Sequence, residues 1–212
     1  MANNVYSRIA FREINEDAVN KLKELFDRCE EPEEWGRKWF ADMFVEGDVT
    51  YDNVKQYEWT CEHIGPKWCY IEDHSFEPDD VFLQTESAWS PPEQGMIKLL
   101  EILTEIDPNI VTTMTYEDEM PNFIGAYVYK GTEIVDGVED DSDEIIEYIL
   151  DDNPELREHW NEDTDDWITD EDGSYTEASE EASDTYNEVL YEWISIRQDE
   201  IITETLEYME EK

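Results

Sequence analysis

Positively charged residues are scarce in this sequence. Only 14 of its 212 residues are Lys or Arg, against 59 Asp or Glu, so the formal net charge is -45. Nucleic acids and anionic membrane surfaces carry the same sign of charge and repel such a chain. We therefore expect no direct DNA or RNA binding and no membrane association. The expected partners are basic surfaces, including those that other proteins use to hold DNA.

Cysteines and long apolar runs are also scarce. The three cysteines, Cys29, Cys61 and Cys69, are an odd number, which does not suit a disulfide framework. No apolar run approaches the roughly 20 residues that span a bilayer. The first residues, Met-Ala-Asn-Asn, lack the basic and apolar segments of a secretion signal. We expect a cytoplasmic protein with free thiols.

Motifs for catalysis are missing as well. Histidine occurs three times, at His63, His74 and His159, and there is no Gly-x-Ser-x-Gly, glycine-rich phosphate loop or dinucleotide fingerprint. Paired carboxylates can act as acid and base, but among 59 of them pairs arise by chance. We expect no enzymatic activity and no cofactor.

One stretch resembles part of a calcium-binding loop. Asp170-x-Asp172-Gly173 has the spacing, but Ile168 and Ser179 stand at the first and twelfth positions. That loop uses Asp and Glu there. We expect no dedicated calcium site, and nonspecific condensation of cations on the acidic surface instead.

A second group has the side chains of a zinc site. Cys61-x-His63, with Cys69 and His74, supplies sulfur and nitrogen ligands, but the spacing matches no common zinc template. Buried thiols and surface histidines account for these residues better. We therefore expect no metal at this position.

Aromatic residues are plentiful, with 8 Trp, 12 Tyr and 7 Phe. Disordered acidic chains are poor in such residues, so the composition predicts a packed core beneath a very acidic surface. Carboxylates that repel one another in the compact state should make stability rise with salt or with a basic partner.

Residues 1–130 predict an α+β domain. Strand and helix patterns alternate in the order β-α-(insert)-β-β-α-β-β, which fits a split βαβ antiparallel sheet with helices on one face and one extra strand. The insert is expected to begin with a short helix opened by Pro32. The predicted strands are 4–12, 68–76, 81–88, 110–116 and 123–129; the predicted helices are 16–29, the short one with Trp35, Trp39, Phe40 and Phe44, a segment near 52–61, and 90–107.

Composition changes near residues 131–143. Residues 1–130 have a net charge of -17 (28 acidic, 11 basic), and residues 131–212 have -28 (31 acidic, 3 basic). We interpret 131–143 as the exit into an acidic helical extension, 131–212. It should contain a short helix at 144–150, a loop at 161–175, and one long helix or a broken pair at 176–211. One apolar face is predicted for the last segment, with Ala178, Ala182, Tyr186, Val189, Leu190, Trp193, Ile194, Ile201, Leu206 and Met209.

Residues 65–127 carry three short motifs in a set order. Gly65-Pro66-Lys67-Trp68 enters a strand, Ser87-Ala88-Trp89-Ser90-Pro91-Pro92 opens a helix, and Tyr116-Glu117 with Phe123-Ile124-Gly125 forms a hairpin. This order resembles the YubB-like ferredoxin-like domain family of phage and plasmid proteins. The resemblance implies a ferredoxin-like fold, a mobile-element origin and, for a phage protein, the host cytoplasm; it implies no reaction. The chain departs from the family pattern at Pro-Lys-Trp-Cys, where the family has Thr-Lys-Trp-Asp.

The tryptophans of these motifs, Trp68 and Trp89, are interpreted as core residues that fix the start of the helix. The cluster of Trp35, Trp39, Phe40 and Phe44 is likewise interpreted as core and not as a groove for a peptide. Neither group is predicted to bind a ligand.

The carboxylates of residues 139–192 suggest DNA mimicry. A helix rises roughly 1.5 Å per residue, so carboxylates on one face can approach the spacing of phosphates. The hypothesis is a phage- or plasmid-type protein that binds and blocks a basic nucleic-acid-binding host protein: a restriction enzyme, CRISPR effector, nuclease or nucleoid protein. The candidate contact residues are Glu139, Asp140, Asp141, Asp143, Glu144, Asp151, Asp152, Glu162, Asp163, Asp165, Asp166, Asp170, Glu171, Asp172, Glu177, Glu180, Glu181, Asp184, Glu188 and Glu192.

The acidic surface is also compatible with roles that involve no DNA mimicry. The protein can be a non-enzymatic acidic interaction or structural protein that does not imitate DNA. The carboxylates can also form a solubilising face or an adaptation to high intracellular salt, although the latter should spread them evenly. A homodimer through the C-terminal helix is compatible with the pattern too.

Overall fold

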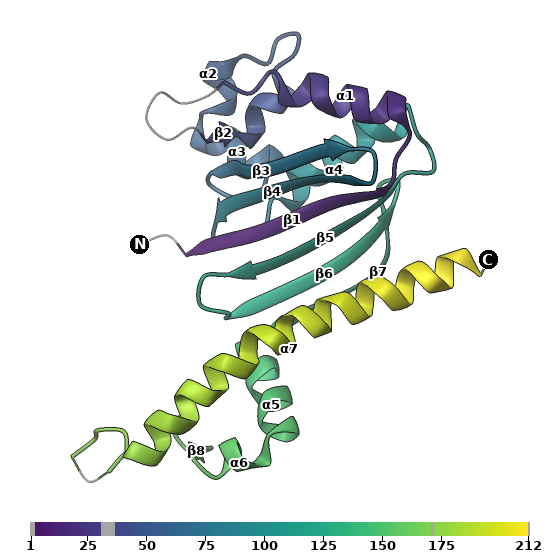
Figure 1. Cartoon of the computed structure of the whole chain (residues 1–212). Coiled ribbons are helices and arrows are strands. Elements are labelled where there is room, and N and C mark those ends of the chain that lie inside the picture. The colour runs from purple at the N-terminus through teal and green to yellow at the C-terminus, as the bar shows by residue number, and fades with distance from the viewer. Residues whose placement is uncertain (1–2, 31–36, 171, 212) are drawn as a thin grey trace. The chain divides into compact units, whose positions relative to one another are not determined.

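The chain forms two compact units, and both include residues of one long helix. The computed structural model describes residues 3–30, 37–170 and 172–211 (Figure 1). Unit 1 comprises the chain up to Glu139 together with the residues from Ile201 onward, and unit 2 comprises Asp140–Glu200. Helix α7 (Glu177–Glu210) supplies residues to both units. The α+β class and the long C-terminal helix agree with the prediction.

Unit 1 is built on a seven-stranded antiparallel sheet in the order β2-β3-β4-β1-β5-β6-β7. The central strand β1 pairs with β4 and β5, so that Val5 lies opposite both Ser87 and Asp118. The predicted hairpins of β3 with β4 and of β5 with β6 are confirmed. The strands are β1 (Asn4–Glu13), β2 (Lys38–Trp39), β3 (Cys69–Glu77), β4 (Asp80–Ala88), β5 (Val111–Asp118), β6 (Phe123–Lys130) and β7 (Glu133–Asp141).

The sheet is larger than the split βαβ unit that the sequence predicts, because β2 and β7 are added at its edges. The interpretation of 131–143 as an exit from the domain is wrong for β7, which is hydrogen-bonded beside β6. The first four residues of β7 are exposed, and five of its nine residues are acidic. An edge strand needs no alternation of apolar residues, and charges on it discourage pairing with other chains. The amino-acid sequence of β7 therefore resembles that of a linker.

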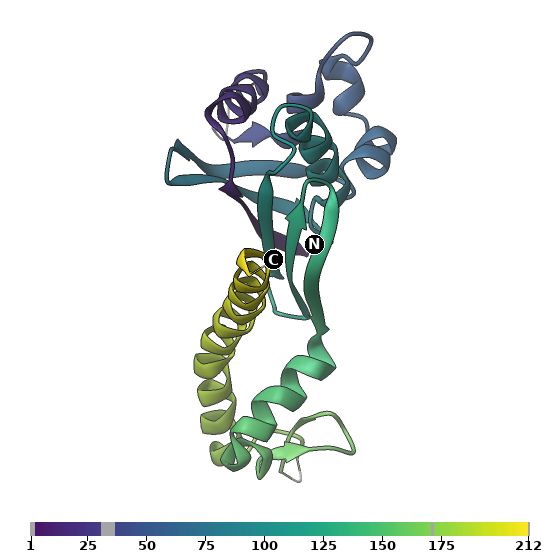
Figure 2. The same ribbon diagram turned by 90° about the vertical axis from the view of Figure 1, so that its right-hand side faces the viewer.

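Helices α1 and α4 lie on the same side of this sheet (Figure 2). In α1, Asn15 accepts a hydrogen bond from the backbone N–H of Ala18 at 2.9 Å, which caps the helix. Helix α1 ends at Phe26, three residues before the predicted end. The helices of unit 1 before α7 are α1 (Glu16–Phe26), the 3-10 helix η1 (Phe40–Phe44), α2 (Tyr51–Val54), α3 (Tyr57–His63) and α4 (Glu93–Thr104).

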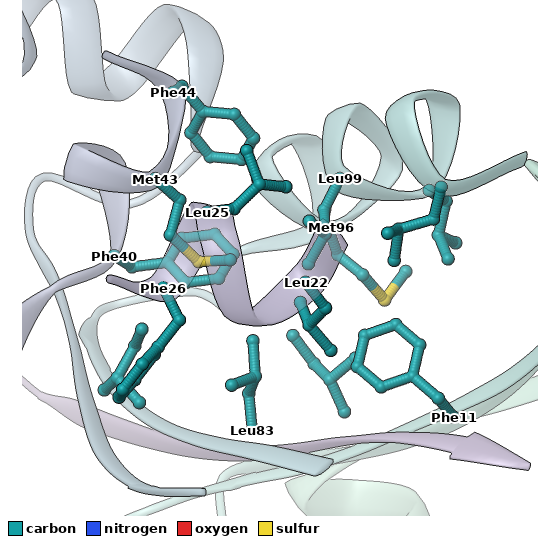
Figure 3. Close-up of a cluster of buried hydrophobic side chains, with 14 of the residues drawn as sticks. Phe11, Leu22, Leu25, Phe26, Phe40, Met43, Phe44, Leu83, Met96 and Leu99 are labelled. Carbon is teal, nitrogen blue, oxygen red and sulfur yellow. The ribbon is translucent and has the colours of Figure 1, made fainter. Parts of the chain in front are cut away.

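The main core lies between these helices and the sheet (Figure 3). Leu22 of α1 and Leu99 of α4 are fully buried, and both point toward Leu83 and Phe11 of the strands. Such burial is the main favourable term in folding. Phe40 also lies in this core, so the interpretation of the aromatic cluster as core is confirmed for it.

The insert between α1 and β3 differs from the prediction in detail. Trp39, expected in the short helix, belongs to the short strand β2, and the helix that follows it is a 3-10 helix at Phe40–Phe44. Pro32 and Trp35 lie outside the described residues. The helical segment expected near 52–61 is divided into α2 and α3. Phe44 is buried and Trp39 packs against the core, in agreement with their predicted role.

The second face of the sheet is partly covered by the end of α7. Ile202 packs with Val111 of β5 and Val128 of β6, and Leu206 and Met209 lie against this cluster. The predicted placement of helices on one face thus holds for α1 and α4, and the C-terminal helix, predicted as part of a separate extension, adds cover on the second face. The last turns of α7 serve as a further helix of unit 1.

Unit 2 consists of α5 (Ser142–Asp152), α6 (Pro154–Arg157), the small hairpin of β8 (Trp160–Asn161) and β9 (Asp166–Trp167), and most of α7. Aromatic pairs stabilise it: Tyr148 stacks on Trp193, and Trp167 contacts Trp160 and Tyr186 edge to face. The predicted helix at 144–150 and the long C-terminal helix are confirmed. The region 161–175 is mostly loop, with β8 and β9 as its ordered part.

The apolar side of α7 is not one face. Ala182, Leu190 and Ile194 are buried in unit 2, whereas Ile202 is buried in unit 1 with Leu206 beside it. At roughly 100° per residue, the two sets are centred about two fifths of a turn apart. The prediction of a single apolar face is wrong because the two helix segments pack in different units.

Gly125 of β6 provides the room for the ring of Tyr116. The two residues are cross-strand partners, and a Cβ at Gly125 would overlap this ring. We predict that Gly125→Ala lowers the free energy of unfolding by about 1–3 kcal/mol, because the ring has to move. Urea denaturation measures this cost. In a Tyr116→Leu background the same substitution should cost much less; equal costs in both backgrounds would contradict the steric explanation.

Asp42 of η1 is a buried carboxyl. Its Oδ2 accepts a hydrogen bond from the backbone N–H of Glu30 at 3.2 Å, but its Oδ1 has no hydrogen-bond partner among the described residues. Burial raises the pKa of Asp42 to about 6, against the lowering effect of the hydrogen bond from Glu30 and the nearby Lys55.

Because the folded-state pKa of Asp42 lies above its unfolded value, the folded state binds this proton more tightly. The free energy of unfolding should therefore fall as the pH rises from about 4 to about 6. We predict that Asp42→Asn is more stable than the wild type at pH 7, by on the order of 2 kcal/mol, and gains little at pH 4. Urea denaturation at both pH values tests this. The same difference at both would show that Asp42 does not titrate in this window.

Candidate functional site

The candidate site is the surface of unit 2. Residues 140–200 contain 24 Asp or Glu and two basic residues, Arg157 and Arg197, a net charge of -22. The core of this unit is correspondingly small, with Ile149, Leu156 and Leu190 among its buried side chains. Most carboxylates are therefore left on the surface.

The clearest arrangement of carboxylates is a row along α7. Its members recur at helical spacing and all are exposed, while Ala182 and Leu190 on the opposite side are buried. Packing of the apolar side thus determines which way the row faces. We call this set the α7 row: Glu177, Glu180, Glu181, Asp184, Glu188 and Glu192.

The spacing of the α7 row approaches that of phosphates. From Glu177 to Glu192 the helix rises about 22 Å, at roughly 1.5 Å per residue. The row thus carries one carboxylate per about 4–5 Å of axis, against roughly 3.4 Å per phosphate along one DNA strand. In the part of the chain that the structure describes, no carboxylate of the α7 row forms an ion pair.

Further carboxylates lie in the hairpin loop between β8 and β9. Glu162, Asp163 and Asp165 are exposed, and Asp165 has a left-handed backbone with φ of 55°. Asp166 is half-buried, and its carboxylate accepts a hydrogen bond from the Tyr175 hydroxyl at 3.0 Å, which raises the pKa of Tyr175. The hairpin carboxylates therefore include both free and structurally engaged groups.

The stretch with calcium-loop spacing closes on itself. The Oδ1 atom of Asp170 accepts hydrogen bonds from the backbone N–H groups of Asp172 and Ser174, at 3.0 and 3.3 Å. Both aspartates are exposed, and Glu171 lies outside the described residues. Among the side chains that the structure describes, no group of three His, Cys, Asp or Glu could hold a metal ion.

Asp140 is a correction to the predicted contact set. Its side chain is 6% exposed and forms an ion pair with Nε of Arg197 at 3.1 Å. This carboxylate raises the pKa of Arg197. Asp140 therefore stabilises unit 2 and is not available to a partner.

Two more of the predicted residues shape α5. Asp141 is its N-cap and accepts hydrogen bonds from the N–H groups of Asp143 and Glu144, both at 3.1 Å. The Glu144 side chain accepts one from the Asp141 N–H at 3.1 Å and completes a capping box. These carboxylates are exposed, but their first role is to begin the helix. Asp143 and Asp152 are exposed as well.

Arg157 gathers three carboxylates. Its guanidinium contacts Glu147 and Asp151 at 2.9 Å each and Glu162 at 3.2 Å. These contacts, that to Glu147 above all, raise the pKa of Arg157. Asp151 and Glu162 of the predicted set are thus partly neutralised. Glu139, also in that set, lies in unit 1 and accepts a hydrogen bond from the Tyr127 hydroxyl at 3.1 Å.

The cysteines and histidines do not converge. Cys29 and Cys69 are buried, and burial raises the pKa of both thiols, that of Cys29 to about 12. The ring of His74 lies 4.1 Å from that of Phe26, and the ring of His63 lies against Trp59. The interpretation as buried thiols is confirmed for Cys69, whereas Cys61 is half-buried.

The interpretation of Trp89 as a core residue is wrong. Its side chain is 60% exposed, whereas Trp68 is half-buried. Trp89 lines a pocket of unit 1 together with Tyr116 and Phe123, and the sequence does not predict this pocket. The signal in the sequence is a tryptophan at the end of a predicted strand, between Ala88 and Ser90 and directly before Pro91 and Pro92.

Within the described ranges, no helix has both the length and the apolar character needed to cross a membrane. Comparisons of the chain with models of protein families, with curated proteins and with solved structures find no match. The resemblance to the YubB-like family stays a prediction.

Proposed function

We propose that the protein binds a basic, nucleic-acid-binding surface of a host protein and blocks it, with the carboxylates of unit 2 in place of phosphates. The observation that carries this proposal is the α7 row, exposed along about 22 Å of helix and free of ion pairs among the described residues. The proposed action is stoichiometric and involves no reaction and no cofactor.

The energetics of such a surface favour a partner with many cations. A single exposed ion pair contributes little, about 0–1 kcal/mol, and salt screens it. The free energies of several such pairs add up. The electric field of unit 2, which has a net charge of -22, steers an oppositely charged partner toward it. Association should therefore be fast at low salt and should weaken steeply as salt is added.

We also propose that unit 1 contains a ferredoxin-like core and shares the mobile-element origin of the YubB-like family. The order β3-β4-β1-β5, with α1 and α4 on one side, is compatible with a split βαβ unit. On this proposal β2, β6, β7 and the end of α7 are additions to that core. The origin makes a host defence or DNA-handling protein the proposed target, met in the host cytoplasm.

A second candidate is an acidic interaction protein that does not imitate DNA. Exposed apolar side chains flank the α7 row, with Tyr191 54% and Ile196 50% exposed. Tyrosine is enriched in protein interfaces, whereas DNA mimicry needs carboxylates alone. A homodimer through α7 would have to screen the repulsion of two α7 rows.

We predict that neutralising the α7 row strongly weakens capture of the partner. The variant replaces its six carboxylates by Gln or Asn. Six exposed pairs at a few tenths of a kcal/mol sum to about 2 kcal/mol, so the affinity should fall about thirtyfold or more. The measurement is capture of basic proteins from host lysate by the immobilised protein, followed by titration of the captured protein.

A control variant neutralises the same number of exposed carboxylates in unit 1, at Glu58, Glu62, Glu77, Asp79, Glu101 and Glu105. It should retain the partner, and duplex DNA should release the partner from the wild type. If both variants lose it equally, net charge explains the binding. If the partner resists duplex DNA, the second candidate is favoured and DNA mimicry is rejected.

A further inference from the structure

A pocket of about 280 Å³ opens in unit 1, remote in sequence from the α7 row. It is formed where the end of β4 turns into α4, with β5, β6 and β7 contributing one side chain each. Segments that are far apart in the sequence thus meet in one recess. Its lining residues are Trp89, Ser90, Pro91, Glu93, Tyr116, Phe123 and Glu139.

One wall of the pocket is aromatic. The ring centroids of Tyr116 and Phe123 are 6.1 Å apart with an edge-to-face tilt, and Tyr127 stacks with Tyr116 at 6.2 Å. Gly125 leaves the space in which the Tyr116 ring lies. The Tyr127 hydroxyl donates to Glu139 at 3.1 Å, which orients this carboxylate beside the rings.

Trp89 lines this pocket in a costly conformation. Its φ is 71°, a left-handed value that bulky residues rarely adopt. Two backbone hydrogen bonds hold this part of the chain in place. The Trp89 N–H donates to Asn3 O at 2.9 Å, and the N–H of the preceding residue, Ala88, donates to Trp68 O at 3.1 Å. Because Trp89 is 60% exposed, burial of the side chain does not offset the strain. Strained residues of this kind cluster at binding sites.

The charge in the pocket is negative and uncompensated. Glu93 and Glu139 both line it, none of its lining residues is basic, and neither carboxylate forms an ion pair with a described residue. Glu93 also stands in the first turn of α4, where a carboxylate interacts favourably with the helix dipole. That role accounts for Glu93 but not for the exposed Trp89 or for the aromatic wall.

We propose that this pocket binds the guanidinium group of an arginine side chain presented by a partner protein. Guanidinium is planar and stacks on aromatic faces such as that of Trp89, while its five N–H donors suit two carboxylates. A quaternary ammonium group has no N–H to offer Glu93 and Glu139. Lysine offers a compact charge that stacks less well on a ring.

This inference is independent of the function proposed for unit 2, since every residue that lines the pocket belongs to unit 1. The pocket would bind one cation at short range and select it by shape, whereas the acidic surface of unit 2 would attract many cations at long range. A failure of one proposal leaves the other untouched.

The test is a titration of the ¹⁵N-labelled protein with acetyl-Gly-Arg-Gly-amide, observed at the tryptophan indole N–H signals. The chain has 8 tryptophans, and the signal that disappears in Trp89→Phe identifies Trp89. We expect this signal to shift and saturate with the arginine peptide. Peptides with citrulline, the uncharged analogue, or lysine in place of arginine should bind about fivefold more weakly or not at all.

The matched control separates the pocket from general attraction to an acidic protein. Glu93→Gln should weaken binding about fivefold or more, whereas Glu101→Gln, which removes one exposed charge from the same helix α4, should leave it unchanged. Equal weakening by both variants, or equal binding of the lysine peptide, would overturn the proposal in favour of nonspecific condensation. Tighter binding of free arginine than of the peptide would make this a small-molecule site and overturn the docking of a protein.

Discussion

Repulsion among 59 carboxylates, with 14 basic side chains to offset it, constrains every part of this structure. Some arginines are placed so that one guanidinium pairs with more than one carboxylate. Arg157 binds three, and Arg37 binds Glu72 at 3.0 Å and Glu86 at 2.8 Å. Cations also stand where a carboxylate would otherwise be buried alone, as Arg197 does beside Asp140. Burial of an unpaired charge is far more costly than exposure of one.

This use of cations leaves the α7 row without ion pairs to described residues. The row stays exposed because the opposite side of α7 is needed for packing in unit 2, where Ala182, Leu190 and Ile194 are buried. The same helix then buries Ile202 in unit 1. One continuous helix therefore has to satisfy two cores, and the carboxylates of the α7 row lie on the side of the helix that packing in unit 2 leaves exposed.

The proposed surface and the proposed pocket attract positive charge by different physics. The α7 row acts through many weak, solvated charges, so its effect is long-ranged and sensitive to salt. The pocket of Trp89 and Tyr116 places two carboxylates beside aromatic rings, where shape and hydrogen-bond geometry select the cation.

Features that depend on near neighbours along the chain follow from the amino-acid sequence alone. The alternation in β1, the cap at Asn15, both hairpins and the helical pattern of α7 are local periodicities, and so is the spacing of the α7 row. Strand β7, the exposure of Trp89 and the burial of Asp140 depend instead on the tertiary structure. An edge strand, a strained turn and a buried ion pair each need partners distant in sequence, such as β6, Asn3 and Arg197. No local sequence pattern predicts those partners, because they stabilise these features only after folding has brought them together.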